Sequence, residues 1–334
     1  MFFWWLGCTQ EAQDSSFEEE TSFRIVLLAD SHVIGPNYVC CSESEGIDNS
    51  SIMKTPERLR AAVDKINLLD PQPDLVFLMG DVVHDAYVGD DLSWYLSNES
   101  AFEVASGILS ELSAPFYPVF GNHDYHYRCD GSGHSKQLSH DLFKHYFQAE
   151  PYYAVSHKGF RFVVTNSQLG ATWDSASEQC DTSLGSYGAT QLEWIEEQLD
   201  AEEPTFVFAH HMLAVTKSDE EEGGEYPGLR ALLEAKSDRL EGLYVGHTHR
   251  WIDFTETYGF THIVMGATRY DDDNFWLLEL DSEMKTAQIL DKDKSGWATP
   301  CAEDWLYDGM VDYEAILNDL PYPNPEQEED GDCE

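Results

Sequence analysis

Five short apolar runs, each followed directly or after one glycine by polar side chains of the kind that bind metals, constrain the fold of this chain most strongly. The runs cover residues 24–29, 75–79, 116–120, 206–209 and 243–245. Each run is short and rich in branched or aromatic residues, which is typical of a buried strand. In layered α/β proteins the loops beyond the carboxyl ends of the strands form the functional crevice. We therefore expect the five polar clusters to converge on one site.

Nine residues in these clusters are candidate functional residues. The candidate metal ligands are Asp30, His32, Asp81, Asn122, His210, His247 and His249, and the candidate catalytic residues are His123 and Asp124. A ligand set with four histidines suits Mn, Fe, Zn or Co better than Ca or Mg. Two metals about 3.5 to 4 Å apart share ligands. Asp81, central in the order and preceded by Gly80, is the candidate bridging carboxylate.

The order and spacing of the clusters resemble the five signature blocks of the calcineurin-like metallophosphoesterases. The blocks are Asp30-Ser31-His32, Gly80-Asp81-Val82-Val83-His84, Gly121-Asn122-His123-Asp124, Ala209-His210-His211 and Gly246-His247-Thr248-His249. Five blocks in order are far more specific than a single motif. The resemblance covers roughly residues 22 to 290. It implies an α/β fold, a four-layer αββα sandwich of two mixed β-sheets flanked by helices.

The resemblance also implies which residues hold each metal ion. One divalent or trivalent ion is expected on Asp30, His32, Asp81 and His249, and the second on Asp81, Asn122, His210 and His247. His211 is an alternative to His210, but His210 comes first after the apolar run. His84 is interpreted as a residue that supports the ligands or begins a helix.

The expected chemistry is hydrolysis of a phosphate ester by in-line attack of a metal-bound hydroxide. His123 is expected to protonate the leaving oxygen or stabilise its charge. Asp124 is expected to orient His123 through a hydrogen bond from imidazole to carboxylate. The loop at residues 33–53 is long and without periodicity, and we expect it to form part of the substrate rim.

Differences between this chain and related subfamilies limit the classes of substrate that we expect. Purple acid phosphatases place a Tyr ligand where this chain has His84, and protein phosphatases of the superfamily carry an Arg where Asp85-Ala86-Tyr87 stands here. The chain is instead similar to the bacterial class III group of cyclic-nucleotide phosphodiesterases and broad phosphatases. The expected substrate is a small phosphomonoester or phosphodiester, and a cyclic nucleotide is the alternative substrate. A further alternative is a non-catalytic protein that binds a partner at the cell surface. The complete set of ligands argues against the last.

Charge limits the partners. The chain has 334 residues, with 63 acidic against 19 basic side chains and a net charge of −44. Such an excess repels nucleic acid polymers and anionic membrane surfaces. We expect a small phosphorylated substrate, which the metals attract locally, and the sequence does not indicate an oligomeric state.

The two ends of the chain differ in composition from its centre. Residues 1–21 resemble a truncated lipoprotein signal ending at Cys8, followed by an acidic tether, although the basic start of such signals is missing. We expect export, as a cell-envelope lipoprotein or a periplasmic or extracellular protein whose only membrane contact is a lipid at Cys8, with a cytoplasmic protein as the alternative. Residues 22–290 are the expected phosphoesterase domain, 291–320 a C-terminal extension and 321–334 a disordered acidic tail.

The six cysteines after Cys8 predict disulfides if the protein is exported. Adjacent cysteines seldom bond each other because the ring is strained. We therefore expect Cys40 and Cys41 to pair with Cys129 and Cys180, and Cys301 to pair with Cys333.

Local patterns predict the elements between the clusters. Helices are expected at residues 55–69 and 101–112, and a third after a capping box formed by Thr190 and Glu193. A hairpin is expected at 152–166 with its turn at Lys158-Gly159, and closing strands at 261–264, 275–280 and 286–290.

Overall fold

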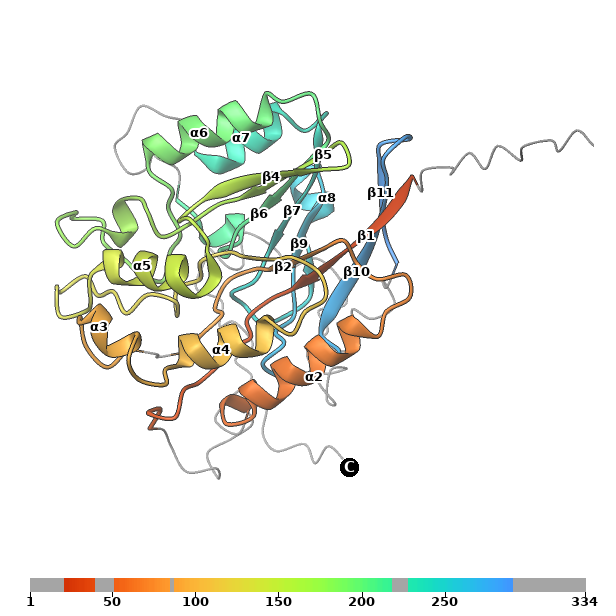
Figure 1. Ribbon diagram of the computed structural model, residues 1–334. Coiled ribbons are helices and arrows are strands. Elements are labelled where there is room, and N and C mark those ends of the chain that lie inside the picture. The colour runs from red at the N-terminus through yellow and green to blue at the C-terminus, as the bar shows by residue number, and fades with distance from the viewer. Residues whose placement is uncertain (1–20, 40–50, 85–86, 218–227, 291–334) are drawn as a thin grey trace, which may run out of the picture.

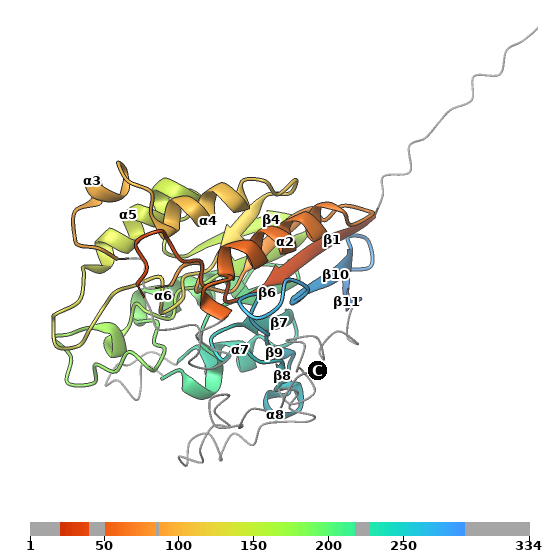
Figure 2. The ribbon, with the colours of Figure 1, turned by 90° about the horizontal axis from the view of Figure 1, so that it is seen from below.

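The computed structural model describes residues 21–39, 51–84, 87–217 and 228–290. Two β-sheets pack face to face, and helices cover their outer faces (Figure 1). The view from below shows α2, α4 and α5 on one side of the sandwich and α7 on the other (Figure 2). This arrangement confirms the predicted four-layer fold with two mixed sheets.

The first sheet has five strands among the described residues, in the order β11-β10-β1-β2-β3. The strands are β1 (Ser22–Leu28), β2 (Leu75–Leu78), β3 (Phe116–Pro118), β10 (Phe275–Asp281) and β11 (Thr286–Ile289). Strands β1, β2 and β3 are parallel, whereas β10 is antiparallel to both of its neighbours. The carboxyl ends of β1, β2 and β3 therefore meet at one edge of the sheet.

The second sheet has six strands within the described ranges, in the order β4-β5-β6-β7-β9-β8. They are β4 (Tyr153–His157), β5 (Phe160–Val164), β6 (Thr205–Phe208), β7 (Leu240–Val245), β8 (Ile252–Asp253) and β9 (His262–Val264). Strands β5, β6, β7 and β9 are parallel, and β4 and β8 run antiparallel at the two edges.

Alternation along the central strands explains the continuous apolar runs. In β1, Val26 and Leu28 face the helices, whereas Ile25 and Leu27 face the second sheet. A strand buried on both faces needs apolar residues at every position, unlike a strand with one face in water. The same holds for β6, where Val207 packs under helices and its neighbouring phenylalanines pack between the sheets.

The helices pack in two outer layers. The first layer holds α2 (Thr55–Asn67), α4 (Ala101–Leu109) and α5 (Lys136–Phe147), and the second holds α6 (Ala189–Leu199) and α7 (Leu229–Ala235). Shorter turns are α3 (Leu92–Tyr95), α8 (Thr255–Tyr258), η1 (Ala171–Trp173) and η2 (Leu213–Val215). The predicted helices at 55–69 and 101–112 are confirmed, although α4 ends at Leu109.

The predicted hairpin is also confirmed as β4 and β5, with Lys158 and Gly159 at positive φ in the turn. The predicted closing strands correspond to β9, β10 and β11. The predicted capping box is wrong. Helix α6 begins at Ala189 after Gly188, which has no side chain to cap it, so Thr190 lies inside the first turn.

Several predictions fall outside the described residues. They concern the signal and tether up to residue 20, Cys8, the cysteines Cys40, Cys41, Cys301 and Cys333, and the segments 291–320 and 321–334. Within the described ranges, no helix combines the length and the apolar character that crossing a membrane requires.

Candidate metal centre

Asp30, His32, Asp81 and His249 form the first half-site. Asp30 lies just after β1, Asp81 just after β2, and His249 beyond the end of β7. One ligand atom from each of the four residues lies within 4.8 Å of the others. His32 Nε2 is 2.8 Å from His249 Nε2 and 3.5 Å from Asp81 Oδ2. The structure thus brings together the four residues predicted for the first metal.

Asp81, Asn122, His210 and His247 form the second half-site. Asn122 Oδ1 is 2.9 Å from His210 Nε2 and 2.9 Å from His247 Nδ1. His210 Nε2 is also 3.3 Å from Asp81 Oδ2. Asp81 Oδ2 therefore lies against both half-sites, which is the position that a bridging carboxylate requires.

The second half-site contains acceptors but too few donors. His210 Nδ1 lies 2.8 Å from the Met79 carbonyl, which can only accept, so this nitrogen carries a proton. In a neutral His210, Nε2 then presents a lone pair to Asn122 Oδ1 and Asp81 Oδ2, which are acceptors as well. Asp81 Oδ2 is buried and has no hydrogen-bond donor among the described residues. A bound cation would interact favourably with these converging lone pairs in place of hydrogen-bond donors. The side chains therefore fit a metal ion.

Burial sets the protonation of the imidazoles. It lowers the pKa of His32 and His249 well below the usual value, and burial together with His210 lowers the pKa of His247 to about 3. These three rings are therefore neutral near pH 7, which is the form that binds metals. His210 differs, because the carboxylates of Asp81 and Asp30 outweigh burial and raise its pKa to about 9, so without a cation this ring is protonated near pH 7 and must lose a proton to bind a metal.

The two carboxylates of the centre shift in opposite directions. Burial, partly opposed by His210, raises the pKa of Asp30 well above its usual value. Burial would also raise the pKa of Asp81, but His210 and His123 hold it well below its usual range. The Asp81 carboxylate is therefore charged at neutral pH, as a ligand of two cations must be.

Five of the seven candidate ligands have left-handed backbone. The φ angles of Asp30, His32, Asp81, His247 and His249 lie between 47° and 76°. Non-glycine residues rarely adopt this conformation, and such strain gathers at functional sites. The close approach also needs glycine at Gly121, because a Cβ there would collide with the Asp81 backbone and carboxylate.

His123 lies at the edge of the centre. Its backbone N–H donates to Asp81 Oδ1 at 2.7 Å, and its half-buried ring stacks on His84 with the centroids 4.5 Å apart. His84 Nδ1 in turn lies 2.9 Å from His32 Nδ1. His84 is thus a support for a candidate ligand, one of the two roles predicted for it, and does not begin a helix.

The expected hydrogen bond between Asp124 and His123 is not made. The buried Asp124 carboxylate instead accepts from the N–H groups of Val83, at 3.0 Å, and Gly121, at 2.8 Å. Burial and the Asp81 charge raise the pKa of Asp124 to about 8. The prediction was wrong because the carboxylate turns inward and joins the second block to the third.

A sixth polar cluster was not predicted. Asn166, Ser167 and Gln168 follow β5 and are fully buried. Ser167 Oγ lies 2.7 Å from His211 Nδ1, whereas His210 contacts the other candidate ligands. This favours His210 over His211 as ligand. The apolar run that ends at Val164, one residue before the polar stretch from Thr165, is the signal that could have revealed the cluster.

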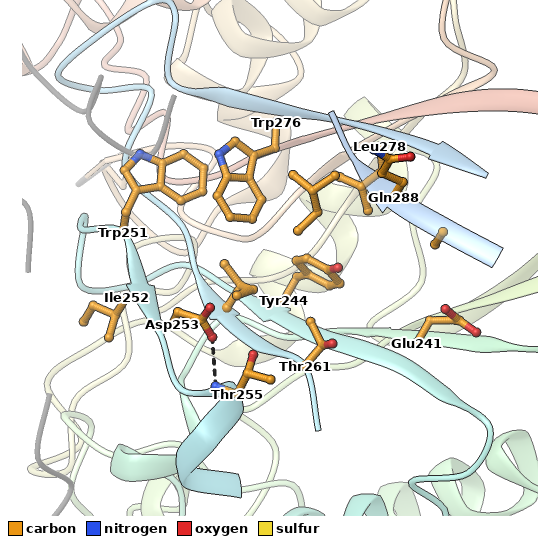
Figure 3. A pocket seen from close by; sticks show the side chains of 13 residues that line it. Glu241, Tyr244, Trp251, Ile252, Asp253, Thr255, Thr261, Trp276, Leu278 and Gln288 are labelled. Carbon is orange, nitrogen blue, oxygen red and sulfur yellow. Dashed lines mark hydrogen bonds between the residues drawn. The ribbon is translucent and has the colours of Figure 1, made fainter. Parts of the chain in front are cut away.

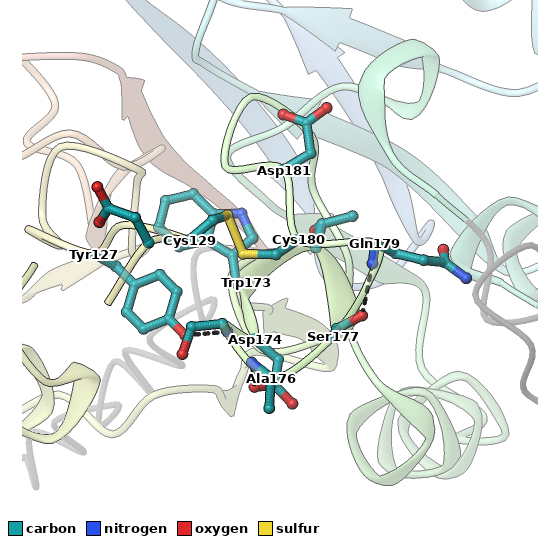
Figure 4. Close-up of a disulfide and its surroundings, with 12 residues drawn as sticks. Tyr127, Cys129, Trp173, Asp174, Ala176, Ser177, Gln179, Cys180 and Asp181 are labelled. Atoms are coloured by element: carbon teal, nitrogen blue, oxygen red, sulfur yellow. Dashed lines mark hydrogen bonds between the residues drawn. A yellow bond between two sulfur atoms is a disulfide. The ribbon is translucent and has the colours of Figure 1, made fainter. Parts of the chain in front are cut away.

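The predicted pairing of Cys129 and Cys180 with Cys40 and Cys41 is wrong. Cys129 and Cys180 bond each other, with their Cα atoms 5.6 Å apart (Figure 4). The loop after the third block and the loop after η1 lie side by side here, since the Tyr127 hydroxyl accepts from the Ser175 N–H at 2.6 Å. Sequence spacing alone could not show this contact between loops of different sheets.

Known proteins resemble this chain in sequence pattern and in fold. The family model of calcineurin-like phosphoesterases matches residues 23–251. A dimetal phosphatase from Danio rerio has a similar structure, with a TM-score of 0.51, 17% sequence identity, and 77% of this chain and 92% of that chain covered. A purple acid phosphatase from yellow lupin (Lupinus luteus) gives a TM-score of 0.46 and 14% identity, with 80% and 53% covered. No match was found among curated proteins.

The family match covers most of the described chain and all five blocks up to His249. The family depends on two metal ions, and this structure gathers the side chains of a candidate metal centre at the strand ends. The chain belongs to the calcineurin-like phosphoesterase family and is a metal-dependent phosphoesterase.

Proposed function

We propose that this chain hydrolyses small phosphate esters at a two-metal centre formed by the two half-sites. The observation that carries the proposal is Asp81 Oδ2, a buried acceptor that lies within 3.5 Å of an imidazole nitrogen from each half-site and has no donor when His210 is neutral. Two transition metal ions of the Mn, Fe, Zn or Co class, when bound, supply positive charge for the phosphate and activate water.

The residues of the chain have distinct parts in this mechanism. Asp81 Oδ1 is held by the His123 N–H, which leaves Oδ2 to face both half-sites. The Met79 carbonyl holds the ring of His210, and His84 holds the ring of His32, so each half-site has one ligand fixed by a hydrogen bond. The half-buried His123 ring is the proposed proton donor to the leaving oxygen.

The substrate in this proposal is a small phosphomonoester or phosphodiester. A cyclic-nucleotide phosphodiesterase is the second candidate, because the same centre serves both chemistries. The substrate rim predicted at 33–53 lies partly outside the described residues, which omit 40–50. The Cys129–Cys180 disulfide supports the proposed export of the protein, since disulfides persist in oxidising compartments.

A substrate panel tests the proposal. Full-length protein would be assayed with phosphomonoesters, phosphodiesters and cyclic nucleotides, each with added Mn, Zn or Fe and with a chelator control. We expect turnover that the chelator abolishes and metal restores. A preference for cyclic nucleotides would identify the protein as a cyclic-nucleotide phosphodiesterase, the second candidate. Absence of turnover with every metal would favour the non-catalytic binding role.

A further inference from the structure

A second cavity lies away from the metal centre, between the two sheets at the edge where β10 and β11 face β7, β8 and β9 (Figure 3). Its volume is about 570 Å³, which is within the range of small-molecule sites. No candidate metal ligand lines it. The cavity therefore belongs to neither half-site.

Three of the residues that line the cavity are aromatic. Trp251 and Trp276 stack with their ring centroids 4.3 Å apart, and Tyr244 lies beside them (Figure 3). All three side chains are more than nine-tenths buried. Trp276 Nε1 makes no hydrogen bond within the described part of the chain. A ligand here meets the faces of these aromatic rings.

Two carboxylates give this aromatic cavity a negative charge. Glu241 and Asp253 lie on opposite sides of Tyr244 in Figure 3, and no Lys, Arg or His is among the described residues that line the cavity. Neither carboxylate forms a salt bridge with a described residue. Burial raises the pKa of Glu241, and burial together with both carboxylates raises the pKa of Tyr244. The cavity thus combines apolar surface with two carboxylates, of which Glu241 is half-buried and Asp253 is exposed.

We propose that this cavity binds an organic cation of the alkylammonium class. Aromatic faces attract such cations through their quadrupoles, and the attraction grows when the site excludes water. A hydrated metal ion gains little from ring faces, and a neutral apolar molecule gains nothing from Glu241 and Asp253. A cation that carries alkyl groups gains from both the aromatic ring faces and the two carboxylates. The proposal does not depend on the phosphatase reaction.

A titration calorimetry experiment compares two ligands of one shape. Choline carries a quaternary ammonium group, whereas 3,3-dimethylbutan-1-ol is its neutral isostere. At fixed ionic strength we expect full-length protein to bind choline at least tenfold more tightly, a difference of about 1.4 kcal/mol. The double variant Glu241→Gln/Asp253→Asn should lose this preference. An asparagine at 253 can still accept the hydrogen bond that Asp253 takes from the Thr255 N–H at 2.9 Å.

A matched control separates the cavity from the general negative charge of the chain. The double variant Glu193→Gln/Glu197→Gln removes two exposed carboxylates from α6 and should keep the preference for choline. Equal binding of the two ligands, or an equal loss in both double variants, would overturn the proposal. So would the absence of choline binding, as expected if a second copy or residues 291–334, which follow β11 in sequence, filled the cavity.

Discussion

Strand β2 has an aspartate near each end, and the two aspartates meet very different surroundings. Asp74, just before the strand, has Oδ2 at 2.7 Å from Lys158 Nζ and 2.6 Å from His157 Nε2. Asp81, after the strand, also faces imidazoles, but its Oδ2 accepts no hydrogen bond from a described residue. Asp74 Oδ2 thus has hydrogen-bond donors from Lys158 and His157. Asp81 Oδ2 has none when His210 is neutral.

The pKa alone does not separate these two carboxylates. Burial opposes ionisation of both, and neighbouring cationic groups nevertheless lower the pKa of Asp74 and of Asp81. Hydrogen bonding does separate them. Asp74 is a satisfied ion pair that ties β2 to the β4–β5 turn, whereas Asp81 retains an acceptor for a cation. Between these two carboxylates, the unsatisfied acceptor and not the perturbed pKa distinguishes the metal centre.

Replacing Asp81 gives the largest expected effect. Asp81→Asn removes the charge that both half-sites share, so metal analysis should find both ions lost more completely than after a change at any other single ligand. Turnover should fall about 10³-fold or more, since metal ions supply several kcal/mol of transition-state stabilisation. Asp74→Asn is the matched control and should keep both ions. Two ions per chain in purified Asp81→Asn would refute the bridging role.

His123→Ala should keep both metals and lose turnover by about 10²- to 10⁴-fold, because general acid help has that size. The loss should be larger for alkyl phosphates than for nitrophenyl phosphates, whose leaving groups need no proton. His145→Ala, at an exposed position on α5, is the control. An equal loss on both substrates would instead indicate electrostatic stabilisation or positioning.

His84→Phe should weaken the first half-site alone. The substitution keeps a ring to stack on His123 but removes the hydrogen bond to His32, and loss of such support typically costs 10- to 100-fold in metal affinity. The second half-site should be unchanged, because a backbone carbonyl supports His210. A metal titration that resolves two binding steps is the measurement. Equal weakening of both steps would contradict this assignment.

Asp74→Asn gives the smallest expected effect, at most about 1 kcal/mol of unfolding free energy. Because the folded pKa of Asp74 is lowered, its contribution is present above the unfolded pKa of about 3.9 and is lost as the pH falls through the folded value. Urea unfolding at pH 7 and at pH 3 should show a gap between variant and parent that narrows in acid. If the difference in unfolding free energy were larger at pH 3 than at pH 7, the pKa of Asp74 would not be lowered in the folded protein.

The sequence predicted the layers and the convergence of the polar clusters because both depend on regular patterns. An apolar run such as residues 75–79 places the next residue at a sheet edge, whatever the rest of the chain does. The directions of single side chains were not predictable in this way. Asp124 turned away from His123 toward two backbone N–H groups, and Cys129 met Cys180 because loops from different sheets lie side by side.

The inward-facing Asp124 carboxylate has a kinetic consequence. By accepting from Val83 and Gly121, it joins the loops of Asp81 and Asn122 without any help from a cation. We therefore expect the metal ions to bind to ligands that are already in position. Metal binding should not be coupled to folding, as it is in small zinc domains. Its rate should rise in proportion to the concentration of free ion, and the far-ultraviolet circular dichroism of the protein should stay constant while the centre is loaded or stripped.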